Sequence, residues 1–302
     1  MKTKDAILLV ILAALWGASF LFIRISATDF GPIPLMTVRV TVAALFMSVI
    51  FFLKKGGVRG ASGKILPIFV IGVLNQAIPF CLFAYAELSL SAGVTSVVNA
   101  TTPLWASLIA FFWLGDRLTR GRIAGLLLGF LGVVILVWHD LARLGTPSGM
   151  APLAVLAATF FYGVSANFSK RFLRGVDSLT VATGSMIAAA VVLLPMGAVH
   201  WPAAAIPAGS WLSAIALAIA CTGVAYIIYF HLIAAVGPAK AVSVTFLIPI
   251  FGILWGMLFL HETLSVSMVL GCAVVIVGTL LASGMIRRPL SFGRPSSRNL
   301  RK

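Results

Sequence analysis

The sequence contains little charge and very few acidic residues. Only 10% of its 302 residues are charged, and Asp and Glu together number seven. Soluble domains carry about 25% charged residues, because their outer surface must be covered with polar side chains. A chain with so little charge cannot cover a soluble fold of this size. Its solvent is therefore expected to be lipid.

The scarce acids and cysteines do not form a catalytic or metal-binding pattern. The acids are Asp5, Asp29, Glu87, Asp116, Asp140, Asp177 and Glu262. All lie at or near the ends of apolar stretches or between them. An HExxH helix, an acidic pair at helical spacing and a Walker-type phosphate loop are absent from the sequence, and the three cysteines lie in apolar runs without metal-ligand spacing. We therefore expect no enzyme activity, no metal and no cofactor.

Apolar residues dominate instead, at 61% of the chain, with a mean hydropathy of +1.12. About 20 helical residues cross the hydrocarbon core of a bilayer. Ten stretches of about that length can be marked, and the sequence thus predicts an all-α membrane protein with ten transmembrane helices. They lie near 5–28, 33–54, 65–88, 92–114, 120–138, 150–172, 178–199, 210–235, 239–260 and 265–286. Within the fifth, Leu126 is predicted to face lipid.

The basic residues are strongly biased to one side of the predicted membrane. With the amino terminus in the cytoplasm, 19 of the 22 Lys and Arg residues lie on the cytoplasmic side, and one, Arg143, lies on the other. Cytoplasmic loops carry such an excess of positive charge. We therefore expect both termini in the cytoplasm. The net charge of +15 then indicates anchoring of helices rather than binding of nucleic acid.

The two halves of the chain share one register. A constant offset of 146 residues aligns, without a gap, Trp16 with Tyr162, Ser19 with Ser165, Pro103 with Pro249, Asp116 with Glu262, and Gly125 with Gly271. Each half has five spans, an odd number, so the two copies cross the membrane in opposite directions. Such inverted repeats are typical of transporters. We expect repeats over 1–146 and 147–286, followed by a basic, disordered cytoplasmic tail over 287–302.

Several of these motifs together resemble the drug/metabolite transporter superfamily, EamA type. They are Trp16-Gly17-Ala18-Ser19-Phe20, an arginine early in the second span (Arg39), the matched prolines, and Gly-Asp or His-Glu followed nine residues later by Gly125 or Gly271. The resemblance implies ten helices around a central cavity. It also implies that export of amino acids or related metabolites across a bacterial inner membrane is a common activity.

The lack of a carboxylate deep in a span bears on the substrate. A buried organic cation needs an acidic partner, so the sequence favours a neutral or zwitterionic solute, and it offers no obvious proton carrier. Anionic metabolites or drugs are the alternative. Anionic substrates would require Arg39, Arg24 or Lys170 to face the cavity. A channel-like pore or a non-transporting scaffold remains a further alternative. The expected partners are a small-molecule substrate and the lipid bilayer, and the oligomeric state stays open.

Symmetry predicts which side chains face the solute. Polar groups in lipid are costly unless they face protein or water, and matched residues at i, i+4 and i+7 share one helix face. The predicted substrate-binding residues are Trp16, Ser19, Gln76, Phe80, Phe83, Asn99, Tyr162, Ser165, Thr222, Tyr226, Tyr229 and Thr245.

Four further residues receive conditional roles. Arg39 is expected either to snorkel to the outer surface, to pair with Glu87, or to contact a substrate carboxylate. Pro103 and Pro249 each remove an intrahelical hydrogen bond, so they should bend their helices near mid-span. These bends are candidate hinges, with a static kink as the alternative.

Overall fold

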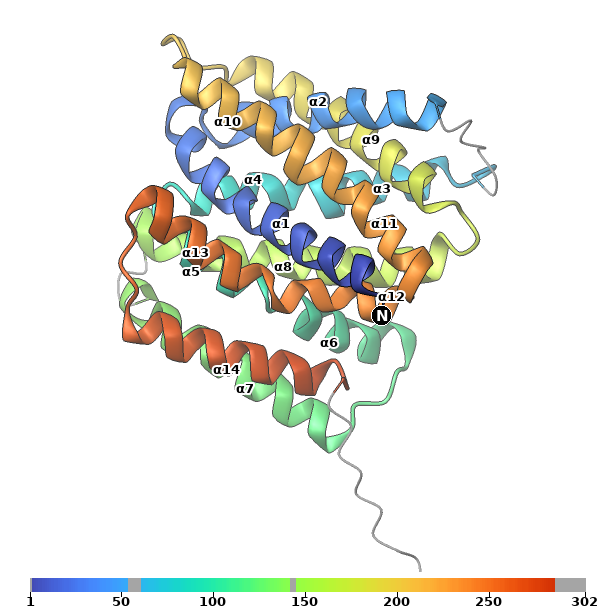
Figure 1. Ribbon diagram of the computed structural model, residues 1–302, viewed down its shortest axis with the longest axis vertical. Coiled ribbons are helices and arrows are strands. Elements are labelled where there is room, and N and C mark those ends of the chain that lie inside the picture. Colours follow the sequence, from blue (N-terminus) through green and yellow to red (C-terminus); the bar gives the residue numbers. More distant parts are fainter. Residues whose placement is uncertain (1, 54–60, 142–144, 286–302) are drawn as a thin grey trace, which may run out of the picture.

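A computed structural model describes residues 2–53, 61–141 and 145–285, and every regular element within these ranges is a helix (Figure 1). The elements are α1 (Thr3–Phe30), α2 (Pro32–Leu53), α3 (Ile65–Ile71), η1 (Gly72–Ala77), α4 (Ile78–Ala86), α5 (Ala92–Asn99), α6 (Thr102–Leu114), α7 (Arg120–Leu141), α8 (Pro147–Phe172), α9 (Ser178–Val199), α10 (Ala208–Ala218), η2 (Ile219–Val224), α11 (Ala225–Val236), α12 (Pro238–Val242), η3 (Ser243–Phe246), α13 (Ile248–Leu260) and α14 (Val266–Ala282). The predicted tail over 287–302 lies outside the described residues.

The helices have the length and composition of membrane spans. Nine stretches in the described ranges are long and apolar enough to cross a bilayer, and Val266–Ala282 is a shorter apolar helix. Each of the ten predicted spans coincides with one of these stretches. The prediction of an all-helical membrane protein is therefore confirmed, with the last span shorter than expected.

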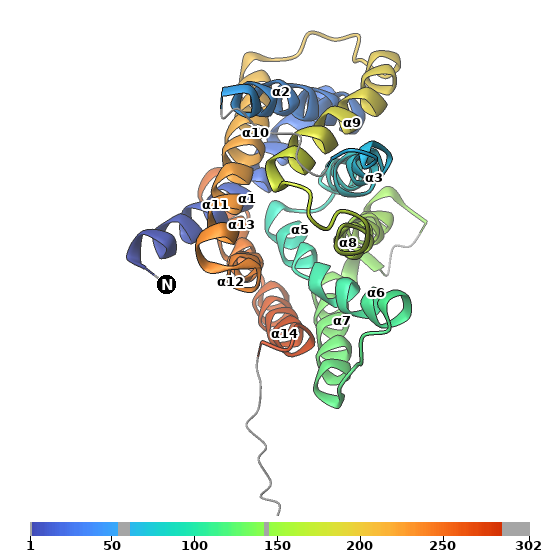
Figure 2. The same cartoon turned by 90° about the vertical axis from the view of Figure 1, so that its right-hand side faces the viewer.

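Two helix pairs lie at the extremes of the molecule's long axis. Helix α2 packs against α9 at one extreme, and α7 packs against α14 at the other (Figures 1 and 2). In the sequence, the offset of 146 residues aligns α2 with α9 and α7 with α14. Each pair therefore joins equivalent segments of the two halves. The remaining helices fill the space between the two pairs.

The connections gather at two ends. Those between α1 and α2, α4 and α5, and α13 and α14 lie at one end, which we call the distal end (Figure 1). The amino terminus and the connection between α6 and α7 lie at the other, which we call the amino-terminal end. An exposed ion pair between Lys170 and Asp116, at 3.3 Å, also lies at the amino-terminal end.

Glycines allow the closest helix contacts. A Cβ at Gly278 of α14 would lie 2.3 Å from the backbone nitrogen of Gly129 in α7. Helices in membranes associate through such small residues, because the backbones can then approach closely. Leu126, on the same helix as Gly129, is only 8% exposed and packs with buried Leu104, so the prediction that it faces lipid is wrong. Its neighbour Leu127 is 69% exposed.

Equivalent glycines seat the first helix of each half against the opposite half. A Cβ at Gly17 would lie 2.6 Å from the Cβ of Phe251, and a Cβ at Gly163 would lie 2.8 Å from the Cβ of Trp105. The offset of 146 relates Gly17 to Gly163, and it also relates Trp105 to Phe251. The same contact is therefore made twice, once by each half.

The matched prolines interrupt their spans. Span 92–114 divides into α5 and α6, and span 239–260 divides into α12, η3 and α13. Pro103 and Pro249 are each the second residue of the helix that follows the break. Proline fits a first helical turn because its missing N–H has no partner there, and it disfavours helical geometry in the preceding residue. The structure thus has a new helical segment at each site, where the sequence predicts a bend.

Candidate functional site: a cavity shared by both halves

A cavity of about 370 Å³ lies between the helices of the two halves. Small-molecule sites commonly measure about 300–1,000 Å³. Eleven sequence-predicted residues line it, namely Trp16, Ser19, Arg39, Phe80, Phe83, Asn99, Pro103, Tyr162, Tyr226, Tyr229 and Thr245. Sequence reasoning did not select its other lining residues, which include Phe20, Ile23, Asn75, Thr102 and Cys221. In space, the lining extends from Ile23 of α1 to Val242, the last residue of α12. Because α12 lies beside the amino terminus (Figure 1), the lining reaches toward the amino-terminal end.

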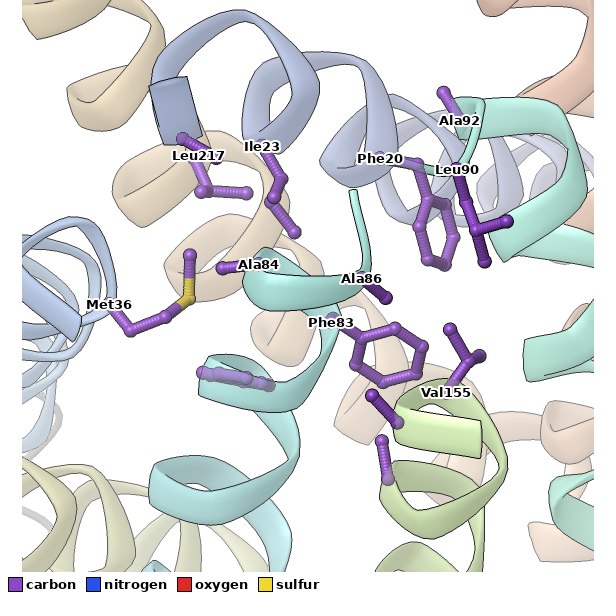
Figure 3. Close-up of a cluster of buried hydrophobic side chains, with 14 of the residues drawn as sticks. Phe20, Ile23, Met36, Phe83, Ala84, Ala86, Leu90, Ala92, Val155 and Leu217 are labelled. Carbon is purple, nitrogen blue, oxygen red and sulfur yellow. The ribbon is translucent and has the colours of Figure 1, made fainter. Parts of the chain in front are cut away.

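Aromatic rings form much of the wall. The rings of Trp16 and Tyr229 lie 5.2 Å apart, and the rings of Tyr162 and Phe83 lie 5.8 Å apart. The offset of 146 relates these two pairs, so each half contributes one ring to each pair. On the distal side of the wall, Phe20 of α1 packs edge-on against Phe83 of α4 (Figure 3).

Two π-helical turns change which residues face the cavity. Regular α-helical spacing places Gln76 and Thr222 on the cavity face. Both residues lie in π-helical turns, η1 and η2, where the backbone hydrogen bonds join residues five apart instead of four. The preceding residue in each half, Asn75 or Cys221, lines the cavity instead. The regular spacing therefore misplaces both side chains.

The predicted polar residues that do not line the cavity bind residues close to it. Gln76 Nε2 donates to Ser185 Oγ at 3.1 Å, and Ser165 Oγ donates to Asn75 Oδ1 at 3.1 Å. Thr222 Oγ1 accepts a hydrogen bond of 3.1 Å from Arg39 Nε. Ser165 and Thr222 thus fix the orientation of two cavity-lining side chains.

Arg39 brings a positive charge to the cavity without an acidic partner. Its side chain is buried, and its guanidinium carbon lies 3.7 Å from the centre of the Phe80 ring. Besides the bond to Thr222, the guanidinium makes one long contact of 4.0 Å with the sulfur of Met36. Within the described residues no carboxylate lies within 4.0 Å of it. A guanidinium has five N–H donors, so most of these donors remain free for a bound anion.

Glu87 lies away from the cavity lining, at the distal end. Its side chain is fully buried, and in the described part of the chain neither carboxyl oxygen has a hydrogen-bond partner. Its backbone carbonyl accepts a hydrogen bond from Arg24 Nη1. The Arg39–Glu87 ion pair that the sequence allowed is not formed in this conformation.

A contact that the sequence did not reveal joins the two halves at the distal end. Glu262 precedes α14, and its carboxylate accepts hydrogen bonds from the backbone N–H groups of Ala92 (2.7 Å) and Gly93 (3.1 Å) at the start of α5. Ala92 is fully buried, and Leu90 is almost fully buried. Sequence spacing carries no signal for this contact, since its partners are about 170 residues apart. No group of three or more His, Cys, Asp or Glu that could hold a metal is found among the described residues.

The arrangement of apolar helices, matched halves and a shared cavity agrees with the comparison to known families. The sequence pattern of the EamA-like transporter family matches residues 4–138 and, a second time, residues 149–284. The chain belongs to the EamA-like transporter family. It is therefore a multi-pass membrane transporter, and members of this family are not enzymes.

Individual relatives of this EamA-type chain are distant but match over nearly their whole length. A probable terminal-alkyne amino-acid exporter of Streptantibioticus cattleyicolor is 28% identical and covers 98% of each chain. A probable amino-acid metabolite efflux pump of Escherichia coli is 24% identical over 92% of this chain and 94% of its own. The uncharacterized transporter YoaV of Bacillus subtilis is 20% identical over 88% and 92%.

A solved crystal structure supports the fold of the EamA-type chain. It matches with a TM-score of 0.66 at 20% sequence identity, over 95% of this chain and 100% of the other. At this identity the match concerns the fold alone.

Proposed function

We propose that the protein exports small zwitterionic metabolites, in particular amino acids with apolar or aromatic side chains, by alternating access. The observation that carries this proposal is the chemistry of the cavity, in which aromatic walls surround one guanidinium without an acidic partner. A substrate carboxylate bound to Arg39 would supply the missing negative charge. Charge-assisted hydrogen bonds from arginine to carboxylate are among the strongest in proteins.

The opposite end of the solute meets rings and hydroxyls. Trp16, Tyr226 and Tyr229 pack together on the side of the cavity formed by α1 and α11. An ammonium group over such rings gains about 0.5–2 kcal/mol from cation–π attraction. Since no acid is among the described residues that line the cavity, this attraction suits a zwitterion better than a free cation.

Alternating access requires two halves that can exchange roles. We infer that the halves form an inverted repeat of residues 1–146 and 147–286, related by an axis in the membrane plane. The duplicated contacts Gly17–Phe251 and Gly163–Trp105 support this inference. We infer that the distal end is closed in this conformation, because Glu262 binds the start of α5 there, and that the cavity opens toward the amino-terminal end. With both termini in the cytoplasm, as the basic residues favour, the cavity would face inward in a bacterial inner membrane.

The names of two relatives agree with the proposed substrate class, since they describe an amino-acid exporter and an amino-acid metabolite efflux pump. Anionic metabolites are the second candidate. Arg39 is the observation in their favour, but within the described ranges it is the one basic residue that lines the cavity. Lys170 pairs with Asp116 at the amino-terminal end. A single cation matches a carboxylate better than a multiply charged phosphate.

The proposal is tested by counterflow in proteoliposomes preloaded with unlabelled solute. Radiolabelled phenylalanine and leucine should enter with saturation, whereas phenylalanine amide, which lacks the carboxylate, and phenethylamine should not. Equal flux of the amine would contradict the proposed substrate class. Flux without saturation would indicate a pore, and the absence of flux for every solute tested, anions included, would indicate a scaffold.

A further inference from the structure

The Glu87 carboxyl group has no evident structural role, although it is among the largest fully buried side chains of the protein. Neither of its oxygens finds a hydrogen-bond donor among the described residues. Buried polar groups are nearly always paired, so an unpaired one calls for an explanation. A buried carboxylate without a partner is costly enough that the group takes up a proton instead.

The charged groups around Glu87 do not neutralise it. Arg24 of α1, Arg39 of α2 and Glu262, which precedes α14, are the charges that act on its carboxyl. Arg24 donates to the backbone carbonyl of Glu87 rather than to its side chain. Neither arginine comes within 4.0 Å of the carboxyl oxygens, and Glu262 adds a further negative charge. Helix α8, which packs on α4, presents the phenol of Tyr162 to Phe83.

The position of Glu87 connects it to the cavity and to the closed end. It follows α4 directly and lies seven residues beyond Phe80, on the same face of that helix. Phe80 stacks under the guanidinium of Arg39. The segment that follows Glu87 leads directly into α5, whose first amides are bound by Glu262 (Figure 3 shows neighbouring Ala86, Leu90 and Ala92).

We propose that Glu87 is a proton-binding site, and that its proton is exchanged with water when the distal end opens. While that end is closed, the carboxyl carries the proton and is neutral. When α5 moves away, water reaches the carboxyl, the proton leaves to that water, and the carboxylate can pair with Arg24. Protons on the distal side therefore favour the closed conformation, because only that conformation binds them tightly. This inference concerns how pH controls the opening of the distal end, and it does not depend on which solute is carried.

Infrared spectroscopy can detect the proton directly, because the chain contains only two glutamates, Glu87 and Glu262. Full-length protein in lipid is prepared with glutamate ¹³C-labelled at the side-chain carboxyl. At neutral pH, a carbonyl band of a protonated carboxyl should shift on labelling. Detecting this shift in the wild-type protein requires neither a variant nor a transported solute. The band should vanish in Glu87→Gln and persist in Asp116→Asn, an exposed acid at the amino-terminal end. A missing label-sensitive band, or one that persists in Glu87→Gln, would overturn the proposal.

A second readout follows the opening itself. Ser96 of α5 is buried against Gly252, so Ser96→Cys, in a background without the native cysteines, should react with maleimide only when the distal end opens. Its labelling rate, divided by that of the unfolded protein at the same pH, should rise with pH. With Glu87→Gln the ratio should stay low at every pH. A ratio that rises equally in both proteins would show that Glu87 does not control the opening.

Discussion

Arg39 Nε donates a hydrogen bond of 3.1 Å to Thr222 Oγ1, and the offset of 146 residues converts this pair into Ser185 and Gln76, which are also bonded at 3.1 Å. Equivalent helices therefore make this contact twice, and each time it joins one half to the other. Only the first copy contains a charge. The cavity thus has a positive charge on one side, which would orient the zwitterionic solute that we propose.

The aromatic wall should contribute to binding. Trp16→Ala or Tyr226→Ala is expected to weaken binding of a transported amino acid by about 5–30-fold, because each removes roughly 1–2 kcal/mol of ring contact. The control is Leu127→Ala, since this side chain is exposed on the outside of α7. Binding is measured on purified protein by scintillation proximity. Equal losses in all three variants would show that the rings are packing residues only.

The breaks at the matched prolines should matter for conformational change. Pro103→Ala and Pro249→Ala restore a backbone donor and permit a continuous helix, so counterflow should slow several-fold while equilibrium binding stays close to that of the wild type. Pro147→Ala changes the first residue of α8, at an exposed helix end, and should leave the rate unchanged. Unaltered rates in the first two variants would assign the breaks a static role.

The contact between α7 and α14 should tolerate no additional atoms. Gly278→Ala places a methyl group 2.3 Å from the backbone of Gly129, and we expect a loss of about 1–3 kcal/mol from overpacking. Gly209→Ala, in α10, meets no atom within 4 Å. It should preserve or raise stability, because alanine favours helix more than glycine does. Thermal unfolding in detergent measures both, and equal midpoints would contradict the packing argument.

The contact of Glu262 at the distal end should contribute more to the free energy of unfolding than the exposed ion pair of Asp116 does. Glu262→Ala leaves the amides of Ala92 and Gly93 without acceptors, at a cost of about 1–3 kcal/mol. Asp116→Ala, at the equivalent position of the first half, removes an exposed ion pair worth about 0–1 kcal/mol. Thermal midpoints are compared at matched lipid content. A larger loss for Asp116→Ala would show that Glu262 does not hold the distal end.

Much of the fold follows from the sequence, because apolar stretches in lipid must form helices. In addition, a constant offset of 146 residues relates the two halves. The failures have local causes. Periodicity assumes an α-helix, so the π turns shifted the cavity face from Gln76 and Thr222 to Asn75 and Cys221. Leu126 looked the same as any lipid-facing leucine, since hydropathy does not distinguish lipid from a neighbouring helix. These positions depend on tertiary packing.

The partners of the charged residues could not be predicted from the sequence either. The sequence revealed that Arg39 is unusual, but whether Glu87 paired with it depended on distances across three helices. Among the residues that the structure describes, Arg39 then has no acidic partner and the Glu87 carboxyl has no hydrogen-bond partner. Pairing between segments far apart in the chain, as for Glu262 and Ala92, has no signature in a single sequence.

The central claim is that Arg39 binds the carboxylate of a zwitterionic solute. Its most direct test compares the affinities of wild type and Arg39→Gln for phenylalanine and for phenylalanine amide, by calorimetry on proteins of matched thermal stability. We expect wild type to prefer phenylalanine, and Arg39→Gln to lose about 10–150-fold in affinity for it, since hydrogen bonds to charged groups contribute about 1.5–3 kcal/mol. The variant should no longer distinguish the acid from the amide. Unchanged discrimination in Arg39→Gln would contradict the account.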